Sequence, residues 1–155
     1  MRPGILFTWP MTRYAERTAV VFGKDRLTYA EMDAQINQLC HGLLSLGLKK
    51  GHKIAALLNN GIESAVSILA IPRAGLTYVS LNMRNSSREQ VEIMNDSETD
   101  ALILGEEFTK AMEPVLGSIP SLKHVIVVGA SLPGQLSYEK LVKGQPITLP
   151  DVAVN

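Results

Sequence analysis

The side chains that could do acid–base, nucleophilic or metal chemistry are few and scattered. The three histidines, His41, His52 and His124, lie far apart, and none has a second metal ligand at helical or hairpin spacing. Cys40 and His41 are neighbours in a segment with helical periodicity, where adjacent side chains diverge by about 100° and cannot pair as nucleophile and base. We therefore predict no catalytic residue and no metal site.

Carboxylates and hydroxyls cluster only where the start of a helix explains them. Glu106 and Glu107 stand at a predicted helix N-terminus, where the helix dipole alone favours acidic residues. Thr28 and Ser86 are each followed three residues later by glutamate, which is the spacing of a capping box. Neither of the glycine patterns GxxxxGK[ST] and GxGxxG occurs. The residues alone therefore point to no active site.

Composition and charge narrow the class of protein. Of the 155 residues, 46% are hydrophobic and 19% charged, which is too apolar for a disordered chain. Fifteen basic and fifteen acidic residues cancel, which argues against nucleic acid as a partner. No apolar run approaches the roughly 20 residues of a transmembrane segment, and residues 1–10 make a poor signal peptide. The lone Cys40 suits a reducing compartment, so we expect one globular, cytoplasmic unit.

Elements that could position a site alternate regularly along the chain. Residues 18–22 and 26–27 flank a turn at 23–25 and predict a hairpin. The capping box at Thr28 opens a helix with an apolar stripe, and Gly47 is well placed to end it. Beyond it we expect strands at 54–58, 77–81, 101–104 and 124–128, helices at 63–73, 86–96 and 107–116, and a short helix at 138–142.

The spacing of these strands indicates parallel pairing. Their starts lie roughly 23 residues apart, which leaves room for a crossover helix. We predict an α/β fold: an open, mainly parallel sheet with helices on both faces (βαβαβαβ), preceded by a short N-terminal β-hairpin. Residues 1–17 would be a lead-in, residues 18–130 the α/β subdomain, and residues 131–155 a loop-rich tail.

Ligands of such sheets bind outside the carboxyl ends of the strands. Those ends are Asn59-Asn60, Asn82–Arg84, Gly105-Glu106 and 129–131. Arg84 is the only fixed positive charge among them and is the candidate to bind a phosphate or carboxylate. A solvated loop arginine is the alternative interpretation.

Five fragments, in collinear order, resemble the AMP-binding, adenylate-forming enzymes. Each is weak alone, but together they cover about Thr18 to Leu104. The fragments are Leu27–Met32 (LTYAEM), Leu46–Ala55 (LGLKKGHKIA), Leu57–Asn60 (LLNN), Arg73–Asn82 (RAGLTYVSLN) and Asn95–Ser97 (NDS). Asn59, Ser80 and Met83 stand where the family has prolines.

The resemblance implies an acyl-CoA synthetase, similar to fatty-acid–CoA ligases. Such enzymes use ATP to turn a carboxylate into an acyl-adenylate, and CoA or another thiol then displaces AMP. A complete member needs ATP, Mg and CoA, and its phosphate loop (YTSGTTGxPKG), ribose-binding Asp and catalytic Lys have no counterpart here. Residues 149–155 resemble the strand that enters this loop. The resemblance also makes Arg84 a candidate contact for a CoA phosphate.

We therefore expect the N-terminal fragment of an acid–thiol ligase, inactive alone and with no cofactor of its own. Its partner would be the remainder of the ligase or a self-association partner, and carboxylic acid and CoA would bind only in a complete enzyme. One alternative is a stand-alone, non-catalytic binding or dimerisation module derived from that fold. Another is an unrelated small doubly wound domain with a nucleotide or acyl-carrier partner, which does not explain the collinear motifs.

Overall fold

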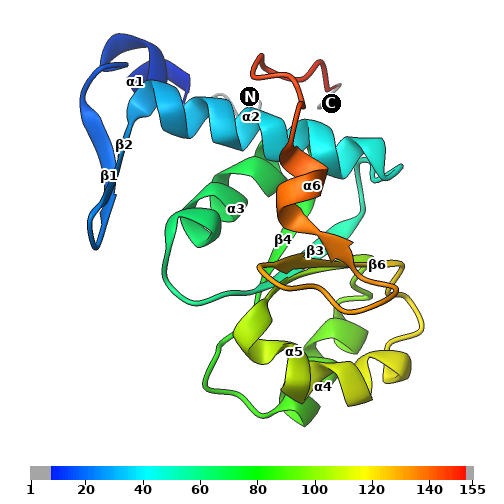
Figure 1. The fold of residues 1–155 in the computed structure, drawn as a ribbon. Coiled ribbons are helices and arrows are strands. Elements are labelled where there is room, and N and C mark those ends of the chain that lie inside the picture. Colours follow the sequence, from blue (N-terminus) through cyan, green and yellow to red (C-terminus); the bar gives the residue numbers. More distant parts are fainter. Residues whose placement is uncertain (1–7, 153–155) are drawn as a thin grey trace.

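The computed structural model describes residues 8–152, so residues 1–7 of the predicted lead-in and residues 153–155 of the predicted tail lie outside it. Helices cover a central sheet, and a separate hairpin lies at the N-terminal end (Figure 1). In chain order the elements are α1 (Thr8–Arg13), β1 (Thr18–Phe22), β2 (Asp25–Thr28), α2 (Tyr29–Ser45), β3 (Lys53–Leu57), α3 (Ile62–Arg73), β4 (Thr77–Ser80), α4 (Ser87–Asp96), β5 (Ala101–Gly105), α5 (Glu106–Met112), the 3-10 helix η2 (Glu113–Ser118), β6 (His124–Val128), β7 (Leu136–Ser137) and α6 (Tyr138–Val142).

The main sheet has five strands in the order β4-β3-β5-β6-β7, and every neighbouring pair is parallel. Strands β1 and β2 form a separate antiparallel pair. The predicted α/β fold with a mainly parallel sheet and an N-terminal hairpin is confirmed. The structure adds β7 beside β6, so the segment expected to be a loop-rich tail contributes a fifth strand to the sheet.

Both faces of the sheet are covered. Helices α2, α3 and α6 lie on one side, while α4, α5 and η2 lie on the other (Figure 1). All five residues of β5 are buried: Ile103 packs into the α2 and α3 side, whereas Leu102 and Leu104 pack into the α4 and α5 side. A strand with two buried faces needs apolar residues at every position, which explains the apolar runs without alternation.

The helix starts follow from local hydrogen bonding. In both capping boxes the hydroxyl accepts from the backbone N–H of the glutamate, at 3.2 Å for Thr28 and Glu31 and 3.3 Å for Ser86 and Glu89. The glutamate carboxylate accepts in return from the cap N–H, at 2.8 and 2.7 Å respectively. Both predicted boxes are confirmed. Gly47 follows α2 with φ of +82°, a left-handed conformation that glycine adopts without strain.

Several elements differ from the prediction. The expected helix at 107–116 ends at Met112 and continues as η2, because Pro114 has no N–H to extend the α-helical bonding. Pro72 lies within the last turn of α3 and does not end it. Helix α1 was not expected in the lead-in. No helix within residues 8–152 is both long and apolar enough to cross a membrane.

Asp100 fastens the amino ends of three strands together. Its backbone N–H donates to the Lys53 carbonyl at 2.8 Å, and its own carbonyl accepts from the Lys123 N–H at 2.8 Å. Its carboxylate accepts from the Lys53 N–H at 2.9 Å and from Lys123 Nζ at 3.0 Å. Strands β3, β5 and β6 therefore share one anchor at this edge, and their carboxyl ends are aligned at the opposite edge.

Candidate functional site

The parallel register brings the loops after four strands to one edge of the sheet. Ala56 pairs with Ser80, Leu57 with Leu104, and Gly105 with Val128, so β3, β4, β5 and β6 end side by side. These are the carboxyl ends from which the sequence predicted a ligand site.

The strand order also places a switch point at this edge. Strands β3 and β5 are neighbours, but the chain leaves β3 toward β4 on one side and leaves β5 toward β6 on the other. Ligand crevices of open α/β sheets lie where such connections diverge. Asn59 Nδ2 donates to Glu107 Oε1 at 2.6 Å across this divergence. The sequence did not locate the switch point, because strand order depends on tertiary packing.

Glu106 and Glu107 join the ends of neighbouring strands. They lie in the first turn of α5, as predicted. In addition, Glu106 Oε2 accepts from the Ala130 N–H at 2.6 Å, and Glu107 accepts from Asn59. Both carboxylates are therefore engaged in binding the loops after β3 and β6 to the start of α5. This arrangement supports their interpretation as structural residues rather than as a general acid and base.

Arg84 lies in the loop after the edge strand β4. Its backbone N–H donates to Asn82 Oδ1 at 3.0 Å, and the Asn82 carbonyl accepts from the Nε2 of Gln90, which is only 1% exposed, at 2.6 Å. These two hydrogen bonds, to the Asn82 side chain and from the buried Gln90, fix the backbone of the loop. The Arg84 side chain is exposed and makes no hydrogen bond or ion pair within residues 8–152. This geometry offers a cation on a fixed loop to an anion from solvent.

A pocket of about 220 Å³ lies beside this loop, between α3 and the carboxyl ends of β3 and β4. Its walls are mixed apolar and polar. They comprise Ala56, Leu58, Asn60, Ser64, Ile68, Tyr78, Ser80, Leu81, Asn82 and Met83. Ile68 and Met83 are 48% and 42% exposed. Arg84 follows Met83 in the chain but does not line the pocket.

Cys40, His41 and His52 each contact a backbone group rather than a side chain that could pair with them as a nucleophile or base. Cys40 is buried, and its Sγ donates to the Ala70 carbonyl at 3.2 Å. Burial raises the pKa of its thiol to about 12, although the charge of Arg73 lowers it. His41 Nε2 lies 2.9 Å from the Thr148 carbonyl, and His52 Nδ1 accepts from the Lys49 N–H at 3.4 Å. Within residues 8–152 no group of three or more His, Cys, Asp or Glu could hold a metal ion.

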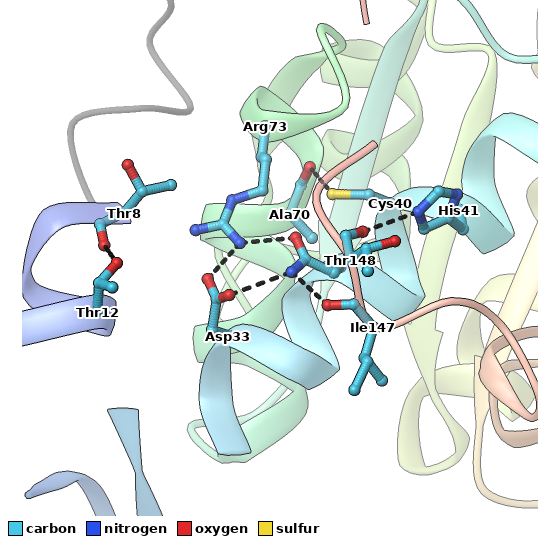
Figure 2. A network of polar contacts seen from close by, with 10 residues as sticks. Thr8, Thr12, Asp33, Cys40, His41, Ala70, Arg73, Ile147 and Thr148 are labelled. Carbon is cyan, nitrogen blue, oxygen red and sulfur yellow. Dashed lines mark hydrogen bonds and ion pairs between the residues drawn. The ribbon is translucent and has the colours of Figure 1, made fainter. Parts of the chain in front are cut away.

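A buried polar network between α2 and α3 was missed by sequence reasoning. The side chain of Arg73 is 2% exposed, and its Nη1 donates to Asp33 Oδ1 at 2.6 Å and to Asn37 Oδ1 at 2.8 Å. Figure 2 shows the Arg73 guanidinium directed toward Asp33, with the main chain at Ile147 and Thr148 close by. The one signal in the sequence was an arginine at the end of a largely apolar helix, in a fragment that resembles the family motif.

The match with a known family covers almost the whole described chain. The profile of the family described as "AMP-binding enzyme" matches residues 7–151. The chain belongs to this family. The predicted resemblance to adenylate-forming enzymes is therefore confirmed.

Two curated relatives and one solved structure illustrate what the chain is similar to. It is 30% identical over 113 residues to a medium/long-chain-fatty-acid–CoA/3-oxocholest-4-en-26-oate–CoA ligase of Mycobacterium marinum, covering 73% of this chain but 20% of that enzyme. It is 28% identical over 141 residues to a 3-hydroxybenzoate–CoA/4-hydroxybenzoate–CoA ligase of Thauera aromatica, covering 90% of this chain and 27% of the enzyme. The crystal structure of the anthranilate CoA ligase AuaEII with anthranoyl-AMP shares 25% identity and a TM-score of 0.90, covering 99% of this chain and 29% of that one.

Proposed function

We propose that these 155 residues form the N-terminal part of an ATP-dependent acid–CoA ligase. In the proposed reaction a carboxylate oxygen attacks the α-phosphorus of ATP and pyrophosphate leaves. The thiol of CoA then attacks the acyl carbon of the acyl-adenylate, and AMP leaves. The strongest support is that the chain superposes over 99% of its length, with a TM-score of 0.90, on 29% of a ligase that was crystallised with an acyl-adenylate.

The chemistry in this proposal is divided between this chain and the rest of a ligase. The chain supplies a packed α/β body, whereas ATP, Mg and CoA belong to the complete enzyme. No segment of this sequence has the pattern of a loop that binds ATP phosphates. We therefore propose that the isolated chain does not adenylate acids. We also propose that the chain divides into a lead-in (1–17), an α/β subdomain (18–130) and a tail (131–155). A cytoplasmic location is proposed as well, because the buried Cys40 forms no disulfide.

The similar ligases do not indicate one acid. One relative is named for fatty acids and a steroid acid, and another for hydroxybenzoates. We therefore propose the class of reaction and leave the acid open.

A domain exchange tests the assignment. The segment of the Thauera aromatica ligase that aligns with this chain would be replaced by the corresponding residues of the chain. We expect hydroxybenzoate-dependent exchange of pyrophosphate into ATP above that of the same ligase with the segment deleted. A folded hybrid with no more exchange than the deletion variant would contradict the assignment.

Within this proposal, Arg84 contacts a phosphate of CoA. Support comes from the fixed Asn82–Arg84 loop and from the exposed guanidinium, which has no partner in the part of the chain that the structure describes. Loss of one charged hydrogen bond costs about 1–2 kcal/mol, so Arg84→Ala in the hybrid should raise the KM for CoA roughly 5- to 30-fold without changing the KM for ATP. Arg88→Ala is the matched control, since Arg88 is also exposed, lies four residues away and pairs with Glu92. Equal shifts in both variants would argue against a specific contact.

A second candidate function is self-association. It is favoured by the outer edge of β4, which pairs with no strand among residues 8–152, and by the exposed apolar side chains of Ile68 and Met83 beside it. This candidate predicts a concentration-dependent dimer in light scattering that Ile68→Asp weakens. A monomer at all concentrations would exclude it.

A further inference from the structure

The chain after α6 forms a mostly exposed strap, defined here as residues 145–149, which lies against the middle of α2 (Figure 1). Its own apolar side chains contribute little burial, because those of Ile147 and Leu149 are 61% and 48% exposed, although the next residue, Pro150, is buried. Main-chain pairing does not hold it either. Among residues 8–152, the only backbone–backbone hydrogen bond of the strap runs from the Gln145 N–H to the carbonyl of Val142.

Three side chains of α2 contact the main chain of the strap instead. Asn37 Nδ2 donates to the Ile147 carbonyl at 2.8 Å, and His41 Nε2 lies 2.9 Å from the Thr148 carbonyl. Gln38 Nε2 donates to the Gln145 carbonyl at a longer 3.4 Å. Asn37 is 2% exposed, so its hydrogen bond is the one most sheltered from competition with water.

Arg73 determines which way the Asn37 amide points. A guanidinium only donates hydrogen bonds, so the amide oxygen must face Arg73 Nη1, at 2.8 Å. The amide NH₂ then faces away from Arg73, where one N–H meets the Ile147 carbonyl and the other meets Asp33 Oδ2 at 3.2 Å. The carboxylate of Asp33 neutralises the guanidinium charge, with Asp33 Oδ1 lying 2.6 Å from Arg73 Nη1.

Packing alone does not account for an arginine at this position. Arg73 Nε and Nη2 are buried and have no hydrogen-bond partner in the part of the chain that the structure describes. Buried donors without partners cost free energy that an apolar side chain of similar size would avoid. The contacts that Arg73 does make, to Asp33 and Asn37, are therefore the reason we assign for its presence.

We propose that Arg73 and Asn37 are positioning residues that latch the strap to α2 and thereby fix where the chain leaves this domain. The significance of this position rests on the proposed ligase function. The strap ends at Leu149, the first residue of the segment 149–155, whose sequence resembles the strand that enters the phosphate loop of adenylate-forming enzymes. A latched strap would deliver that segment to a defined place, whereas a free strap would not.

Nitrogen-15 relaxation of the 155-residue protein tests the latch directly. The amides of Ile147, Thr148 and Leu149 report on the strap, and prolines flank them at positions 146 and 150. We expect order parameters of about 0.85 in the wild type and below about 0.6 in Asn37→Asp. Aspartate keeps an oxygen for Arg73 but has no N–H for the Ile147 carbonyl. Gln38→Leu is the control, because it removes only the long contact, and it should leave the order parameters unchanged.

A second variant tests the part assigned to Arg73. Arg73→Lys keeps the charge, but one ammonium cannot reproduce the fixed fork that orients Asn37. It should lower the order parameters of the strap while those of Leu102 to Leu104 in β5 stay at about 0.85. An unchanged strap in folded Arg73→Lys would overturn the role of Arg73.

Three other results would overturn the latch itself. The first is strap order parameters already below about 0.6 in the wild type. The second is strap order parameters that stay at about 0.85 in Asn37→Asp. The third is a decrease of the strap order parameters in Gln38→Leu as large as that in Asn37→Asp. The measurement involves no ATP chemistry, so its failure would leave the ligase assignment intact. Likewise, a failed domain exchange would leave these order parameters unaffected.

Discussion

Replacement of Asp100 tests whether the amino edge of the sheet depends on one carboxylate. The side chain of Asp100 is 14% exposed and accepts from the Lys53 N–H at 2.9 Å and from Lys123 Nζ at 3.0 Å. Asp100→Ala removes both acceptors and leaves the Lys53 N–H without this partner. Asp100→Asn keeps a neutral acceptor for that N–H and removes only the charge.

The two contacts differ in their contribution to stability. A hydrogen bond from a partly buried N–H to a carboxylate contributes about 1.5–3 kcal/mol. Lys123 is 58% exposed, so the ion pair contributes at most about 1 kcal/mol. We therefore expect Asp100→Ala to lower the free energy of unfolding by about 2–4 kcal/mol, and Asp100→Asn by about 1–2 kcal/mol.

The pH dependence supplies an independent check. Burial raises the pKa of Asp100. The hydrogen bond from the Lys53 N–H, together with Lys123 and His52, lowers this pKa by more than burial raises it, so the folded-state pKa lies below the ordinary value of 3.8. Stabilisation by this carboxylate is then complete above the ordinary pKa and is lost as the pH falls through the folded-state pKa. The difference between wild type and Asp100→Asn should shrink as the pH falls below about 4.

Urea denaturation followed by circular dichroism measures these differences. Asp96→Asn is the control, since Asp96 is exposed at the end of α4, and it should change stability by less than about 0.5 kcal/mol. Two results would refute the assigned role of Asp100. One is a loss in the free energy of unfolding for Asp100→Ala no larger than that for Asp96→Asn. The other is a difference in stability between the wild type and Asp100→Asn that grows as the pH falls.

Two further predictions concern the core. Leu102→Ala opens a cavity in β5, where Leu102 is 0% exposed, and should lower the free energy of unfolding by about 2–5 kcal/mol in the same assay. Ile147→Ala, at a position 61% exposed, should change it by less than about 0.5 kcal/mol, and similar losses in both would contradict the assigned core. Because burial holds the pKa of Cys40 at about 12, a disulfide reagent at pH 8 should label Cys40 rapidly only after denaturation. Rapid labelling of the native protein would contradict its burial.

The elements that sequence reasoning predicted correctly are those with a local cause. The capping boxes at Thr28 and Ser86 mark helix starts through bonds that span three residues. The apolar run at Ile54–Leu58 predicts a strand with two buried faces, and the structure has that strand at Lys53–Leu57. Strand β7 was missed because two residues, Leu136 and Ser137, are too few to display a period.

The site depends on contacts that the sequence does not display. Asn59 and Glu107 meet only because β3 and β5 are neighbours, although β4 lies between them in the chain. Likewise, Arg73 meets Asp33 across 40 residues of sequence. Sequence pattern indicates which residues are buried, but it does not pair distant polar residues. For this reason Arg84 could be proposed from its place after a strand, whereas the Arg73 latch required the structure.

We propose that this chain has the fold of the N-terminal part of an acid–CoA ligase and does not adenylate acids by itself. The most direct test is acid-dependent exchange of labelled pyrophosphate into ATP by the purified 155-residue protein, with medium-chain fatty acids and hydroxybenzoates as substrates and a complete ligase as positive control. We predict no exchange above a blank without protein. Exchange that requires both the acid and this protein would contradict the claim.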